Sequence, residues 1–292
     1  MQDNTIRLSN KKRALFKLLR VKHYIKNGLV FLPLFFSKTI FDYAGLYVAT
    51  LGFLSFCLIS SAIYIFNDVI DREKDRNHPK KKFRPIASGE VSVRAALTIS
   101  ALCFLCSVSV AYYFGSLVAL FVLLLYGILN IFYSVWLKNK PLIDVVILAS
   151  GFVLRVVYGA VLTGIAISGW LNLTIWAGAF FMGLGKRRNE LAKYQQTGET
   201  RAVLKYYTYS FLDKNMYVCM ALTNIFYALW AVGHENANLV WTVPIFMVLM
   251  MKYSLNIEGE SDGDPVEVIF RDYTLIALAV VLVGLLFGFL YF

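Results

Sequence analysis

The sequence predicts an all-α, polytopic membrane protein. Of its 292 residues, 59% are hydrophobic and only 16% are charged, whereas a soluble domain has about 25% charged residues. The apolar residues occur in successive segments long enough to cross a bilayer, and the basic residues cluster in alternate links between these segments, which places them on one side of the membrane. This composition excludes a soluble enzyme that carries a single membrane anchor.

Nine segments of about 20 mainly apolar residues are each long enough to form a transmembrane helix. They cover residues 24–40, 45–68, 93–114, 116–136, 141–164, 169–190, 213–233, 237–257 and 272–291. The first segment is the least regular, because Lys26, Asn27, Pro33 and Lys38 interrupt it. No polar stretch is long enough for a soluble domain, so residues 1–292 are expected to form a single integral membrane domain.

The charge distribution predicts the orientation of these helices. With the N-terminus inside, nearly all of the 29 Lys and Arg residues fall in cytoplasmic loops, with Lys38 outside and Arg155 inside a helix. Residues 1–22 are expected to form a basic amphipathic arm on the membrane surface, not a cleavable signal peptide. The net charge of +11 is explained by anionic membrane lipids and a phosphorylated substrate, and it requires no nucleic acid.

An aspartate-rich stretch ends the second predicted helix. Asn67 and Asp68 are followed by Asp71 and Asp75, and this i, i+3, i+7 spacing places the three carboxylates on one helix face. A carboxylate beside hydrocarbon costs ~2.5–3.5 kcal/mol, and oxygen ligands of this kind suit Mg²⁺ together with substrate phosphates. The sequence therefore predicts a Mg²⁺ site, with Mn²⁺ as a substitute, in which Asp75 contributes least. The alternative is that the acids cap the helix or neutralise the following lysines.

A basic segment follows the aspartates and includes Lys82, Arg84 and Ser88. Its cations, its hydroxyl group and its exposed backbone amides are suited to binding phosphate groups. The alternative is an ordinary cytoplasmic loop with positive charge.

Polar residues also occur within the fourth and fifth predicted helices. Asn130 and Tyr133 near the end of the fourth helix either orient a substrate or anchor the helix at the interface. Arg155 lies eleven residues after Asp144, which places both on the same face of the fifth helix. An arginine this deep in a span is expected to face the bundle interior, either paired with a carboxylate of the second helix or in contact with substrate.

Lys186, Arg187, Arg188 and Glu190 end the sixth predicted helix. The three adjacent cations predict a second anion site opposite the aspartates, and the alternative is a simple charge cluster at a helix end. The four cysteines lie inside apolar helices and the three histidines do not cluster, so neither residue type predicts a disulfide or a transition-metal site.

At Asn67–Asp75 the chain resembles the UbiA superfamily of intramembrane prenyltransferases, of which this motif is the first aspartate-rich motif. The resemblance implies nine helices around a central cavity, with the active site beneath cytoplasmic loops. Most members carry a second aspartate-rich motif at the end of the sixth helix, where this chain has Lys186–Glu190 instead. That departure resembles the decaprenyl-phosphate phosphoribosyltransferase branch, as do Lys26–Phe31, Asp71–Gly89, Gly151–Arg155 and Gly185–Leu191. Tyr24 differs from this branch, which often has Trp there.

This resemblance implies transfer of 5-phosphoribosyl from phosphoribosyl diphosphate to a decaprenyl-type polyprenyl phosphate at the bacterial inner membrane, for cell wall biosynthesis. Asp68, Asp71 and Asp75 would hold Mg²⁺, and Asn67 would help to orient the donor. Phosphate contacts would come from Lys26, Lys82 and Arg84, and from Lys186, Arg187 and Arg188 for either anion. Asn27 would also bind substrate. The alternatives are an aromatic prenyltransferase that uses polyprenyl diphosphate and, less expected, a transporter.

Overall fold

The computed structural model describes residues 13–197, 202–259 and 264–292, and within these ranges the fold is all-α. Seven helices or helix pairs are long and apolar enough to cross a membrane. They are α3 (Tyr43–Ile70), α5 (Val93–Phe114), α6 (Leu117–Val135), α7 (Ile143–Thr163), α9 (Tyr209–Val232), η5 with α10 (Ala237–Glu258) and α12 (Tyr273–Tyr291). The chain is therefore a multi-pass membrane protein, as the sequence predicts.

Three more elements account for the two remaining predicted segments. The segment at 24–40 forms a 3-10 helix, η1 (Val21–Phe31), followed by a short α-helix, α2 (Leu32–Phe36), instead of one continuous α-helix. Pro33 lies in the first turn of α2, where its missing N–H costs no hydrogen bond. The segment at 169–190 forms α8 (Gly169–Thr197), which continues beyond the predicted end.

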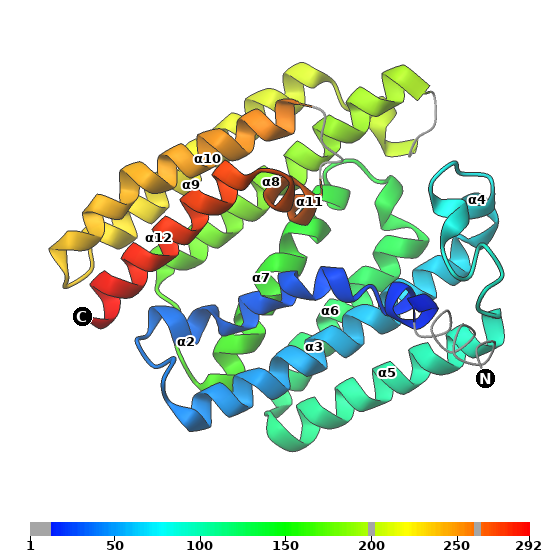
Figure 1. Cartoon of the computed structure of the whole chain (residues 1–292), viewed down its shortest axis with the longest axis horizontal. Coiled ribbons are helices and arrows are strands. Elements are labelled where there is room, and N and C mark those ends of the chain that lie inside the picture. Colours follow the sequence, from blue (N-terminus) through cyan, green and yellow to red (C-terminus); the bar gives the residue numbers. More distant parts are fainter. Residues whose placement is uncertain (1–12, 198–201, 260–263) are drawn as a thin grey trace, which may run out of the picture.

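The helices form two packed groups that are joined through the middle of the molecule (Figure 1). One group contains α3, which contacts α5, α6, α7 and η1, and the other contains α8, which contacts α9 and α10. Contacts between α7 and α8 join the two groups. Backbone packing is closest where η1 meets α7, because a Cβ on Gly159 would lie 2.0 Å from the carbonyl oxygen of Val30.

An apolar cavity of about 260 Å³ lies between the two groups. It is lined by residues of η1, α7, α8, α9, α10, α11 (Pro265–Arg271) and α12, and Leu29, Phe152 and Met182 are among them. The interior of the bundle therefore contains a space suited to hydrocarbon.

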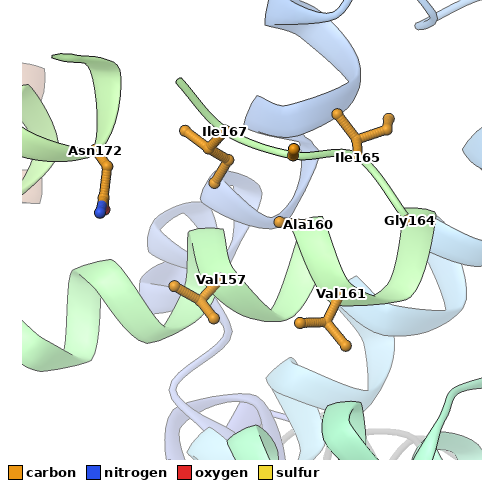
Figure 2. Close-up of a pocket in the computed structure, with 8 residues that line it drawn as sticks. Val157, Ala160, Val161, Gly164, Ile165, Ile167 and Asn172 are labelled. Atoms are coloured by element: carbon orange, nitrogen blue, oxygen red, sulfur yellow. The ribbon is translucent and has the colours of Figure 1, made fainter. Parts of the chain in front are cut away.

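A second hollow, of about 390 Å³, lies at the far end of α7, where the chain turns toward α8. Figure 2 shows Val157, Ala160 and Val161 on the helix beneath it, with Ile165 and Ile167 on the connecting segment. Its lining consists of apolar residues and Asn172, so it offers no charged group for chemistry.

Candidate active site

The end of α3 and the short helix α4 (Arg72–Arg76) carry the predicted aspartates, and both lie at one edge of the molecule (Figure 1). Asp68 and Asp75 are each 3% exposed, and they converge on Arg84. Its Nη1 lies 3.0 Å from Asp68 Oδ1 and 2.7 Å from Asp75 Oδ2. These two carboxylates therefore face the same point in space.

Asp71 faces a different direction from the other two aspartates. It is the C-cap of α3, with ψ of 5°, and its carboxylate accepts a bond of 3.1 Å from Lys138. The predicted single face is interrupted because α3 ends at Ile70 and a new helix begins at Arg72. Asn67 lies half-buried one residue before Asp68.

The residues present fit a divalent ion that is shared with a phosphate-bearing substrate. Within the described ranges, no group of three or more His, Cys, Asp or Glu side chains could hold a metal ion by itself. Asp68 and Asp75, however, already converge on one positively charged nitrogen. Mg²⁺ is often held by one or two carboxylates, with substrate phosphates and water as the other ligands.

Arg20 is a site residue that the sequence did not reveal. Its Nη2 lies 2.5 Å from Asp68 Oδ1, and its guanidinium lies 4.8 Å from the centre of the Tyr64 ring. The preceding residues position it, because Leu18 is fully buried and the Leu19 carbonyl accepts a 2.8 Å bond from Ser61. We expected residues 1–22 to lie on the membrane surface; the burial of Leu18 explains why Arg20 turns inward instead.

A second charged cluster joins η1 to the start of α11. Lys26 donates a 2.7 Å bond to Asp264, the N-cap of α11, and both side chains are largely buried. His23 lies within electrostatic range of Arg20, Lys26 and Lys186. Burial first, and then these cations, lower the pKa of His23 to about 4. Its buried Nδ1 has no hydrogen-bond partner within the described ranges.

Arg155 lies inside the bundle with polar and aromatic partners. It is 5% exposed and donates to Asn27 Oδ1 at 2.8 Å and to the Tyr126 hydroxyl at 3.0 Å. Its guanidinium also lies 5.1 Å from the centre of the Phe56 ring. The carboxylate partner from the second helix that we considered is not among its contacts in the described part of the chain. Arg155 and Asn27 therefore connect η1, α6 and α7.

The three cations at the end of the sixth predicted helix have three different environments. Arg187 is fully buried and bonds to Asp144 and Glu190, each at 2.5 Å, and to the Tyr133 hydroxyl at 2.9 Å. This differs from the direct anion contact that we predicted, because no part of its side chain is exposed.

Arg188 and Lys186 lie on either side of this buried arginine. Arg188 pairs with Asp213 of α9 at 2.6 Å. Lys186 is half-buried, and within the described ranges its side chain has no hydrogen-bond partner. Of the three cations, Lys186 is thus the one positioned to meet an anion.

Three other predicted residues have local roles in the structure. Lys82 is exposed and lies over the Phe83 ring, and the exposed Ser88 donates to the Pro85 carbonyl at 3.3 Å. Asn130 donates to the Tyr126 carbonyl one turn earlier in α6, at 2.8 Å.

The fold and the charged clusters together define an all-α, multi-pass membrane protein with buried carboxylates and cations at one edge of the bundle. Residues 30–275 match the sequence model of the UbiA prenyltransferase family, and the chain belongs to this family.

Curated relatives and solved structures agree with this assignment. The chain is 31% identical to the decaprenyl-phosphate phosphoribosyltransferase of Mycolicibacterium smegmatis, over 96% of this chain and 93% of the relative. It is 33% identical to the protein of that name from Corynebacterium glutamicum, over 96% and 88%. A UbiA homologue from Archaeoglobus fulgidus bound to GPP and Mg²⁺ has the same fold, with a TM-score of 0.73 and 20% identity, covering 96% of this chain and 100% of that structure.

Proposed function

We propose that this protein transfers the 5-phosphoribosyl group of phosphoribosyl diphosphate to a polyprenyl phosphate. The bond between C1 of the ribose and the diphosphate breaks, and a phosphate oxygen of the lipid forms the new bond to C1. The observation that carries this proposal is the match, along nearly the whole chain, to relatives named decaprenyl-phosphate phosphoribosyltransferase. The replacement of the second aspartate-rich motif by cations also supports it.

The arrangement of charges supports a donor that carries two anionic groups. Asp68 and Asp75 would hold Mg²⁺, or Mn²⁺ in its place, against the diphosphate, and the ion would neutralise charge on the leaving group. Arg84 contacts both carboxylates and Arg20 contacts Asp68, and both arginines would donate to the diphosphate oxygens. Lys186 would contact a phosphate from the other side.

The acceptor needs a hydrophobic path and no general base. A phosphate monoester is already anionic, so His23 can remain neutral, as its lowered pKa requires. The apolar cavity lined by Leu29, Phe152 and Met182 would accommodate part of the polyprenyl chain. We place the site on the cytoplasmic face of a bacterial inner membrane, because the basic loops predict that orientation.

The test supplies purified protein in lipid nanodiscs with phosphoribosyl diphosphate labelled in the ribose, polyprenyl phosphate and Mg²⁺. The expected result is a labelled lipid and one equivalent of diphosphate, both abolished by EDTA. Transfer of a prenyl group from polyprenyl diphosphate to an aromatic acceptor, without consumption of phosphoribosyl diphosphate, would refute the proposal in favour of an aromatic prenyltransferase.

A further inference from the structure

Asp264 joins two elements that lie far apart in the sequence. As the N-cap of the seven-residue helix α11, its Oδ1 accepts a 3.0 Å bond from the Val266 N–H. Its Oδ2 accepts the 2.7 Å bond from Lys26, which lies 238 residues earlier in η1. The Asp264 carboxylate therefore fixes both the start of α11 and the side chain of Lys26, which we predicted to bind the donor.

Lys186 also lies within electrostatic range of this carboxylate. Burial by itself would raise the pKa of Asp264, but Lys26 and Lys186 outweigh it and hold that pKa below its usual value. The carboxylate thus remains ionised, with a lysine from each half of the chain near it. Without it, the ammonium groups of Lys26 and Lys186 would repel each other in a largely buried place.

Two lysines that share one carboxylate keep a net positive charge. A lysine side chain is a flexible point charge on four carbons, so it needs a fixed partner to hold one position. The Lys26 ammonium has that partner, with 13% of the side chain exposed. The cluster is therefore able to attract an anion, and Lys26 is held in place before the anion arrives.

We propose that Asp264 is a positioning residue, which holds Lys26 and Lys186 together as the cation pair that receives an anionic group of the phosphoribosyl donor. This inference rests on the proposed function and adds a residue from the last loop of the chain to the donor site. Asp264 itself does not contact the donor, because a carboxylate would repel the phosphate.

The test compares Asp264→Asn with a matched control, Asp272→Asn. Asparagine caps helices about as well as aspartate, so each substitution removes mainly a charge. Asp272 is also an N-cap, that of α12, and it pairs with Lys252 at 2.7 Å, away from the lysine cluster. We expect Asp264→Asn to raise the KM for phosphoribosyl diphosphate about tenfold. The KM for polyprenyl phosphate and kcat should change less than about twofold, and Asp272→Asn should change none of the three.

An unchanged donor KM in Asp264→Asn would overturn the inference, and so would equal losses in both variants, since these would indicate general helix damage. If Asp264→Asn does not fold, Asp264→Glu provides the test. It retains the charge but displaces it by one methylene, and the donor KM should rise about threefold, while an unchanged value would overturn the inference. Wild-type protein that does not consume phosphoribosyl diphosphate would refute the proposed function instead, so the two failures are distinguishable.

Discussion

Substitution of Arg187 by methionine should destabilise the protein more than it weakens substrate binding. Arg187 and Asp144 are both fully buried, and the arginine bonds to Glu190 and Tyr133 as well. Removing one partner of a buried ion pair costs about 3–5 kcal/mol, because the other charge remains buried without compensation. In Arg187→Met, Asp144 retains only the hydroxyl bond from Tyr207, of 2.6 Å, among the contacts described here.

Arg188→Met is the matched control, since it removes the neighbouring cation of the same helix. The pair between Arg188 and Asp213 is partly exposed, with 17% and 28% of the side chains accessible, and such pairs contribute about 1 kcal/mol or less. Thermal unfolding in detergent should therefore rank wild type and Arg188→Met well above Arg187→Met. The double variant Arg187→Met/Asp144→Leu should regain part of the loss, because it leaves no buried aspartate.

Arg187→Met that unfolds at the same temperature as Arg188→Met, and shows a raised KM for either substrate, would refute this reasoning. Arg187 would then contact an anion directly, as the sequence alone suggested. A large fall in stability, with a near-normal KM in the fraction that remains folded, is the result that the structure predicts.

Three further predictions concern the metal, acid stability and topology. Asp75→Asn and Asp68→Asn should each lower Mg²⁺-dependent turnover by about two orders of magnitude. Asp71→Asn should lower turnover by about tenfold or less. The opposite order would contradict a metal site shared by the two carboxylates that contact Arg84. The pKa of His23 is about 4 in the folded protein and 6.5 in its reference state. Between pH 6.5 and pH 4 only the unfolded chain takes up a proton. The stability that is present above pH 6.5 is therefore lost as the pH falls toward 4. His23→Gln should reduce that loss by about 1–2 kcal/mol after allowance for solvent screening, and an unchanged pH profile of thermal unfolding would exclude this role. In a variant without the native cysteines, Lys81→Cys should react with impermeant maleimide from the inside and Asn236→Cys from the outside; labelling from the same side would contradict the nine-segment topology.

The apolar pattern of the sequence predicted the fold well, because a bilayer requires long apolar helices and leaves few alternatives. It failed where polar residues interrupt the first segment. Asn27 is buried and bonds to Arg155, and this tertiary contact stabilises a 3-10 helix at a position that periodicity assigned to a continuous span. Such a partner 128 residues away leaves no local signal.

The aspartate-rich segment shows the same limit at the level of the site. Spacing correctly placed Asp68 and Asp75 near each other, but it also assigned Asp71 to their face. The helix ends between Asp68 and Asp71, so the regular 100° advance that underlies the prediction no longer holds. Arg84 was predicted to bind phosphate, and its contacts with two carboxylates could be found only in three dimensions.

Lys186, Arg187 and Arg188 illustrate why adjacent charges need not share a function. Successive residues of an α-helix point about 100° apart, so three consecutive cations necessarily face three directions. One of these directions leads into the interior, where Asp144 compensates Arg187, and another leads to α9, where Asp213 compensates Arg188. The third direction is that of Lys186, which lies within electrostatic range of Asp264. Asp264 already accepts a hydrogen bond from Lys26. We therefore propose that the anion site contains only one of these three cations, Lys186, together with Lys26 of η1.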